Sequence, residues 1–224
     1  MSLRLPFALV AIVIGLIGLA LDFIVIAGVM GPPQNRPLWS FLVYYWSFLT
    51  NLSNTALILI YIADLMGARW MGWFRDPVTK AGMAGIMMLV MFFYHFMLAP
   101  YLPELPQAIV ISNVLLHYVT PVLYLGWWLF FSSHGSLRYR HLPLMLVPGL
   151  AYVAYIELRG PLAGEYPYTI LDPGFAPPGG TAGGPLAVAI SVGVLVVLVA
   201  IFDLLLVLVD ALIAKRRPLA GGAA

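Results

Sequence analysis

The 224-residue chain contains no cysteine and very little charge. Without cysteine it forms no disulfide and has no thiolate nucleophile, so a disulfide framework and cysteine-dependent catalysis are excluded. Only 9% of the residues are charged and the formal net charge is +2, which gives no support to nucleic-acid binding. In contrast, 62% of the residues are hydrophobic, and the mean hydropathy is +0.99. No water-soluble domain of this length keeps such a surface, so the composition predicts an integral membrane protein.

Six apolar runs are long enough to cross a hydrocarbon core of about 30 Å as helices. The predicted fold class is therefore all-α: a single polytopic domain over residues 1–224, built as a bundle of six transmembrane helices. We place the helices near residues 6–29, 40–66, 79–99, 107–131, 142–159 and 185–213. The first joint is marked by Gly31-Pro32-Pro33, and the longest, residues 160–185, is rich in proline and glycine. Loops of that length often cover functional sites, so we expect residues 160–185 to act as a lid.

The distribution of basic residues predicts the orientation, because Lys and Arg are enriched on the cytoplasmic side of membranes. Only Arg36 and Arg159 fall on one side of the predicted bundle. The other side carries Arg4, Arg69, Arg75, Lys80, Arg138, Arg140, Lys215, Arg216 and Arg217. We therefore expect both termini to be cytoplasmic and the lid to face outward.

The second apolar run contains an unusual cluster of hydrogen-bonding side chains, formed by Thr50, Asn51, Ser53 and Asn54. Such side chains are costly in hydrocarbon unless they meet partners or water, so they should face the protein interior or a cavity. Thr50 lies about ten residues into the second predicted helix, and His117 lies about as far into the fourth, which enters from the same side. At a rise of 1.5 Å per residue, both lie about 15 Å below the outer surface.

A threonine hydroxyl and an imidazole at one depth predict a nucleophile and a general base. The hydroxyl is hardly ionised at neutral pH, so it needs a neutral imidazole within hydrogen-bond reach. Asn51, Asn54 and Asn113 are the candidate amide donors for the oxyanion that would develop. The alternative interpretation is that these polar residues only bond one helix to another, a common use in membrane bundles.

Further polar residues are expected in the outer half of the bundle and are candidates for lining a cavity there. They are Asp22, Ser53, His95, Thr120, Glu157, Arg159 and Tyr166. Asp22 and Glu157 are also candidates to orient His117. Pro121 has no N–H, so the carbonyl of residue 117 should lose its helical partner and become free for another donor. The aromatic residues, Tyr168 and Trp127 among them, are expected mainly in the interfacial belts, whereas Asp203 in the inner half receives no role.

A zinc site is an alternative chemistry for the same region. Asp22, His95 and His117 could supply three ligands to zinc and leave a fourth position for water. However, no two of them share a short-spaced motif, so we expect neither a metal nor another cofactor.

Three stretches taken together resemble the bacterial six-transmembrane branch of the androgen-induced and androgen-dependent TFPI-regulating protein family. They are FLTNLSN at 48–54, LLHYVTP at 115–121, and RG at 159–160 followed by GEYPY at 164–168 and LD at 171–172. Animal members of that family are multipass threonine hydrolases of fatty acid esters of hydroxy fatty acids. The matching positions are Thr50 and His117. The resemblance implies a lipid-ester substrate, an acyl-threonine intermediate, no metal, and the bacterial inner membrane as the location.

The sequence thus predicts an intramembrane lipid-ester hydrolase whose partner is a membrane lipid. The alternative is a membrane carrier, or a lipid-binding protein without catalysis. Nothing in the sequence fixes the oligomeric state.

Overall fold

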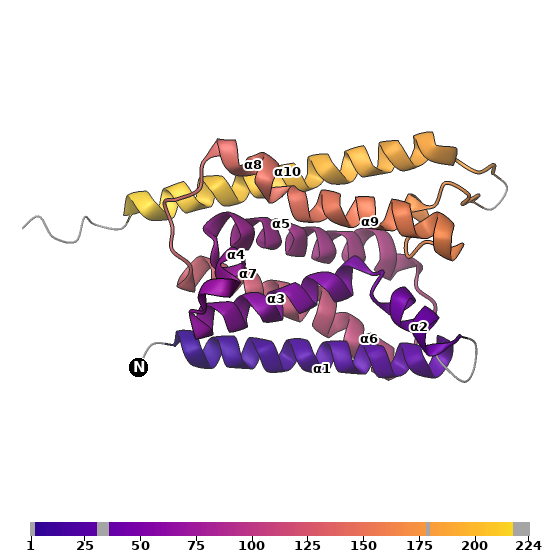
Figure 1. Ribbon diagram of the computed structural model, residues 1–224, viewed down its shortest axis with the longest axis horizontal. Coiled ribbons are helices and arrows are strands. Elements are labelled where there is room, and N and C mark those ends of the chain that lie inside the picture. The colour runs from indigo at the N-terminus through magenta and orange to yellow at the C-terminus, as the bar shows by residue number, and fades with distance from the viewer. Residues whose placement is uncertain (1–2, 31–35, 178–179, 217–224) are drawn as a thin grey trace, which may run out of the picture.

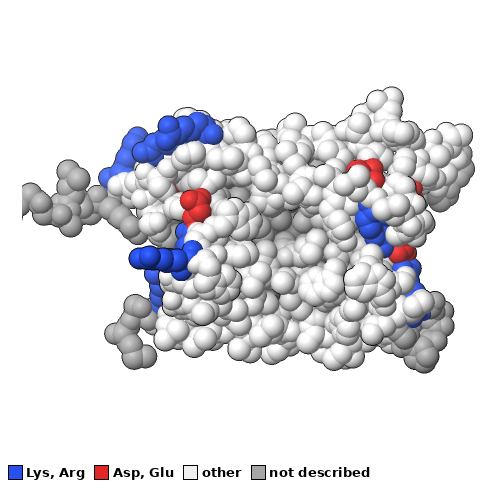
Figure 2. Space-filling view, in the orientation of Figure 1, with Lys and Arg blue, Asp and Glu red and all other residues white. Residues whose placement is uncertain are grey.

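The computed structural model describes residues 3–30, 36–177 and 180–216, and within these ranges every regular element is a helix. Six segments are long and apolar enough to span a membrane: residues 4–29, 49–66, 77–101, 107–131, 139–163 and 184–216. Figure 1 shows them running side by side, and Figure 2 shows charge gathered at the two ends with a broad uncharged band between. The predicted all-α six-helix membrane bundle is confirmed.

Several spans are interrupted by turns of other helical types. The first span is α1 (Arg4–Met30), and the third joins α5 (Pro77–Phe93) to the π-helical turn η2 (Tyr94–Leu98) and the 3-10 turn η3 (Ala99–Tyr101). The fourth joins α6 (Gln107–Val114), the π-helical turn η4 (Leu115–Val119) and α7 (Thr120–Phe131). The fifth joins η5 (Tyr139–His141), α8 (Leu142–Met145) and α9 (Val147–Ala163), and the sixth is α10 (Gly184–Arg216).

The second apolar run differs from the continuous helix predicted over residues 40–66. It is split into α2 (Leu38–Tyr45) and α3 (Leu49–Met66). Side chains and nearby backbone satisfy the polar groups at the break, as an interruption within a membrane requires. The amide of Ser47 donates to the carbonyl of Tyr44, and the carbonyl of Ser47 accepts the hydroxyl of Tyr152 from α9 at 2.9 Å. Thr50 therefore lies in the first turn of a helix and not in its middle.

Helix α5 is the centre of the bundle and contacts α3, α7, α8, α9 and α10. Its buried face carries the small residues Ala81, Gly82, Ala84 and Gly85, which let neighbouring helices approach closely. A Cβ at Gly82 would lie 2.9 Å from the carbonyl oxygen of Met145 in α8. Helix α1 closes the other side by packing on α3, α6 and α7.

The start of α1 and the end of α10 lie at the same end of the bundle, which we call the basal end (Figure 1). The opposite end is the apical end. Near the basal end the carboxylate of Asp64 forms ion pairs with Arg4 and with Lys80. Residues 31–33 of the first predicted joint and Arg217 lie outside the described residues.

The lid predicted over residues 160–185 is shorter than expected, because α9 continues to Ala163 with Pro161 inside it. Gly164 ends the helix with a positive φ of 69°, a conformation that glycine adopts without strain. The chain then folds back over α9. The ring of Tyr166 lies directly against Gly160, and Leu171, in the 3-10 turn η6 (Thr169–Leu171), packs with Tyr152 and Ile156.

Candidate active site

Thr50 and His117 meet in the interior. The Oγ1 atom of Thr50 lies 3.2 Å from Nε2 of His117, and Nδ1 of His117 lies 3.0 Å from the carbonyl oxygen of Asn113. A carbonyl only accepts hydrogen bonds, so Nδ1 carries the proton and Nε2 presents its lone pair to the threonine hydroxyl. The group that orients His117 is therefore the backbone of Asn113, and neither Asp22 nor Glu157, the two candidates by sequence, has this role.

Two π-helical turns hold the imidazole. His117 belongs to η4, and Tyr94 belongs to η2 on the neighbouring span. Their rings stack with centroids 4.0 Å apart and an interplanar angle of 21°. A π turn inserts one extra residue into a helix and re-aims the side chains around it, and such turns are frequent at functional sites.

The π turn also changes which carbonyl Pro121 leaves free. The amide of Thr120 donates to the carbonyl of Leu115, five residues back. The carbonyl of Leu116 then accepts a hydrogen bond from Nδ2 of Asn54 at 3.1 Å, and Oγ1 of Thr120 lies 3.2 Å from it. The carbonyl that receives these side chains is thus one residue before the position predicted.

Asn54 connects the two helices that carry the pair. Its Nδ2 donates to the carbonyls of Thr50 (2.8 Å) and Leu116, while its Oδ1 accepts the hydroxyl of Thr120. Both amide hydrogens are therefore used in this structure, and Asn54 contacts neither of the two cavities described below. Asn54 and Thr120 position the pair, and Ser53 likewise donates to the carbonyl of Thr50 at 3.1 Å.

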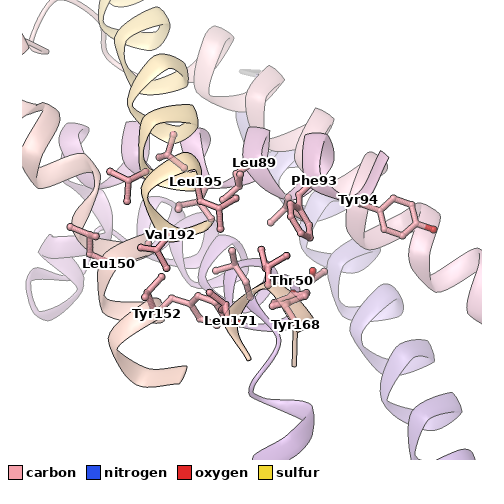
Figure 3. A pocket seen from close by; sticks show the side chains of 18 of the residues that line it. Thr50, Leu89, Phe93, Tyr94, Leu150, Tyr152, Tyr168, Leu171, Val192 and Leu195 are labelled. Carbon is pink, nitrogen blue, oxygen red and sulfur yellow. The ribbon is translucent and has the colours of Figure 1, made fainter. Parts of the chain in front are cut away.

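A long apolar cavity, the basal cavity, begins at Thr50 and His117 and reaches toward the basal end. It holds about 780 Å³ of empty space, part of it open to the surroundings. Figure 3 shows Thr50 and Tyr168 at one end and Leu89, Val192 and Leu195 along the walls. Apart from Thr50 and His117, the polar groups on its walls are tyrosine hydroxyls. Such walls suit a hydrocarbon chain.

A second cavity, the apical cavity, meets the first at the same pair of side chains and has about 690 Å³ of empty space. Thr50, His117, Tyr94, Leu98 and Tyr168 line both cavities. The apical cavity also carries three other polar residues from three different helices: Asp22 of α1, Asn51 of α3 and Asn113 of α6. Thr50 and His117 therefore lie at the junction between an apolar and a more polar compartment.

Asp22 and Asn51 belong to the structure around the break between α2 and α3. Nδ2 of Asn51 donates to the carbonyl of Tyr45 at 3.1 Å, and the carboxyl of Asp22 faces the side chains of Asn51 and Tyr45. The hydroxyl of Tyr45 in turn donates to the carbonyl of Leu19 at 2.9 Å. The break thus exposes Asp22 and Asn51 to the apical cavity in a fixed arrangement.

Tyr168 is a site residue that the sequence analysis assigned to an interfacial belt. Its side chain lines both cavities together with Thr50, and its phenol group interacts electrostatically with the Thr50 side chain and with the backbone of Leu49 and Thr50. Burial raises the pKa of Tyr168, so the hydroxyl keeps its proton at neutral pH and is available as a donor. Its ring packs on Phe48 and Phe93.

Four other candidates lie away from both cavities: His95, Glu157, Arg159 and Tyr166. His95 is exposed, and its Nδ1 lies 3.0 Å from the hydroxyl of Tyr118. Within the described parts of the chain, no three His, Cys, Asp or Glu side chains lie close enough together to hold a metal ion.

Arg159 belongs to a charged cluster at the apical end. The carboxylate of Glu165 accepts hydrogen bonds from Arg36 (2.7 and 2.5 Å) and from Arg159 (2.7 Å), and Arg159 also donates to the backbone carbonyl of Glu165. The hydrogen bonds from Arg36 and then from Arg159 lower the pKa of Glu165 below its ordinary value. The cluster ties the loop after α9 to the segment before α2.

Comparison of the chain with known protein families, with curated proteins and with solved structures finds no match.

Proposed function

We propose that this integral membrane protein is an intramembrane hydrolase of lipid esters in which Thr50 is the nucleophile and His117 the general acid and base. The observation that carries the proposal is the 3.2 Å contact between Thr50 Oγ1 and the unprotonated Nε2 of His117, at the junction of two cavities. The resemblance to the threonine hydrolases of fatty acid esters of hydroxy fatty acids supports the same two residues.

The reaction has two halves. Nε2 of His117 takes the hydroxyl proton while Thr50 Oγ1 attacks the ester carbonyl; the bond to the alcohol oxygen then breaks, and the alcohol leaves with that proton. Water next attacks the acyl-threonine and gives its proton to Nε2. The fatty acid leaves, and Thr50 regains the proton from His117. The hydrogen bond to the carbonyl of Asn113 stabilises the imidazolium that forms in each half.

The first turn of α3 supplies donors for the oxyanion. The first N–H groups of a helix have no partner within it, and those of Leu49 and Thr50 lie beside the nucleophile. The Tyr168 hydroxyl lies at the same place. We propose that these three groups stabilise the oxyanion. Asn54, a candidate for this function by sequence, holds the helices together instead.

The substrate reaches the site from within the membrane. A groove between α3 and α9, with about 980 Å³ of empty space, shares Leu49, Ile86 and Tyr152 with the basal cavity. An acyl chain gains about 0.8 kcal/mol per buried CH₂, so the bilayer concentrates the substrate beside this groove. The excess of basic residues at the basal end supports an orientation with both termini in the cytoplasm, and the resemblance supports a bacterial inner membrane as the location.

The proposal is tested with purified protein in detergent and a fluorogenic long-chain ester, 4-methylumbelliferyl palmitate. Thr50→Ala and His117→Ala are each expected to lower turnover at least about 100-fold. Thr55→Ala is the matched control, because Thr55 is on the same helix and its hydroxyl donates only to the carbonyl of Asn51. Mass spectrometry is expected to find an acyl group on Thr50. Full turnover in either site variant refutes the proposal and favours the carrier or lipid-binding alternative.

A further inference from the structure

Because two cavities meet at Thr50, the acyl half and the alcohol half of a bound ester would lie in different cavities. The scissile carbonyl has to lie beside Thr50 and His117, so the acyl chain extends into one cavity and the alcohol into the other. The basal cavity is apolar along its length, and the residues from Phe93 to Ile86 on α5 line about 10 Å of it. It therefore receives the acyl chain, and the apical cavity receives the alcohol.

The polar side chains of the apical cavity can form hydrogen bonds with hydroxyl groups of a substrate. Asp22 contributes a carboxyl, and Asn51 and Asn113 contribute amides, all from separate helices. Carboxyl and amide groups both donate to or accept from a hydroxyl, whichever protonation state Asp22 adopts. The remaining walls, including Ile26, Leu102 and Leu116, are apolar and suit the carbon atoms of the alcohol.

The same cavity is unsuited to a carboxylate. None of the described residues that line it is Lys or Arg. The two basic side chains of the apical end, Arg36 and Arg159, are both paired with Glu165. A carboxylate that entered would meet the carboxyl of Asp22 with no cation to balance it, which is costly in a buried site.

We infer that the alcohol half of the substrate is a small neutral polyol, so that the ester is a partial glyceride such as a monoacylglycerol, with Asp22 binding the free hydroxyls. This inference rests on the proposed hydrolase function. It differs from the substrate class that the family resemblance implies, in which the alcohol half carries a carboxylate.

The experiment compares three palmitate esters with the purified protein: 1-palmitoylglycerol, the palmitoyl ester of a hydroxy fatty acid, and the methyl ester of that compound. The glycerol ester is expected to have a kcat/KM about tenfold above that of the free acid, which corresponds to about one buried hydrogen bond. Methylation removes the negative charge of the carboxylate, so the methyl ester is expected to have a kcat/KM between those of the free acid and the glycerol ester. Equal or faster hydrolysis of the free acid overturns the inference.

Asp22→Leu provides the second measurement, because leucine has nearly the same shape and no hydrogen-bonding group. The ratio of kcat/KM for the glycerol ester to that for 4-methylumbelliferyl palmitate is expected to fall about tenfold, mainly through KM. Glu104→Leu, which changes an exposed acid at the same end, should leave the ratio unchanged. An unchanged ratio in Asp22→Leu overturns the inference while the hydrolase proposal stands. If Thr50→Ala leaves hydrolysis of the umbelliferyl ester intact, both fail.

Discussion

Asp203 on α10 lies directly against Gly85 on α5, so closely that a methyl group at position 85 would overlap its Oδ1 atom. The side chain is fully buried, and neither carboxyl oxygen has a hydrogen-bond partner among the described residues. The close approach of α10 to the central helix therefore depends on the absence of a side chain at one position of α5.

This contact gives a prediction about stability. Gly85→Ala is expected to destabilise the protein by about 1–3 kcal/mol, because overpacking at this contact forces the helices apart. Adding Asp203→Ala should restore part of the loss, since it removes the overlapping carboxyl. Thermal unfolding of both variants in detergent measures the effect. Gly193→Ala on α10 is the control, because a Cβ there meets nothing within 4 Å. Equal destabilisation of the single and double variants would contradict the explanation.

Tyr168→Phe tests the third oxyanion donor. Loss of one such donor is expected to lower kcat by about 10- to 100-fold with little change in KM, because the hydroxyl acts mainly on the charge that develops in the transition state. Tyr166→Phe is the matched control, since Tyr166 lies two residues earlier and outside both cavities. Similar kinetics for the two variants would remove Tyr168 from the mechanism.

The length of the basal cavity predicts an acyl-chain preference that one substitution can change. Val196 lines this cavity from α10, whereas Val197 is 59% exposed on the outer face. Val196→Phe is expected to raise the preference for octanoyl over palmitoyl esters about tenfold, since displacing about two methylenes loses about 0.8 kcal/mol for each. Val197→Phe should leave it unchanged. An unaltered preference in Val196→Phe would place the acyl chain elsewhere.

Glu165 predicts a pH dependence of stability. Its pKa in the folded protein is lowered by Arg36 and Arg159, so its stabilising contribution is fully present above the ordinary glutamate pKa of 4.5. That contribution is lost as the pH falls through the lowered value. Thermal unfolding from pH 7 to pH 3 should show this loss, and Glu165→Gln should reduce it. A wild-type pH profile in Glu165→Gln would show that the cluster does not stabilise the fold.

The six spans and the meeting of Thr50 with His117 were both predictable from the sequence. Hydrophobic length identifies the spans. The depth predicted for Thr50 required ten residues of continuous helix before it, whereas the structure has α2, a break and only then α3. The pairing was correct although this premise was wrong.

The break itself was not predictable, because Trp46, Ser47 and Phe48 include neither proline nor glycine. Side chains distant in sequence hold it, above all Tyr152. Tyr168 was missed for a related reason: it lies in a loop without periodicity, and only the fold brings it to Thr50. For Asn54, the type of residue indicated a donor, but the three-dimensional contacts decide which acceptor it meets.

The π turn at residues 115–119 has a consequence for the tolerance of the chain to deletions. Removing one residue there would return the span to ordinary α-helical spacing, and because the turn accommodates its extra residue locally, α7 with the fully buried Tyr124 and Trp127 would keep its place in the core. The side chains of the turn itself would be re-aimed, so that the stack of His117 on Tyr94 and the link from Leu116 to Asn54 would be lost. A single-residue deletion at this turn is thus expected to leave the membrane bundle folded while it removes the arrangement on which the proposed catalysis depends.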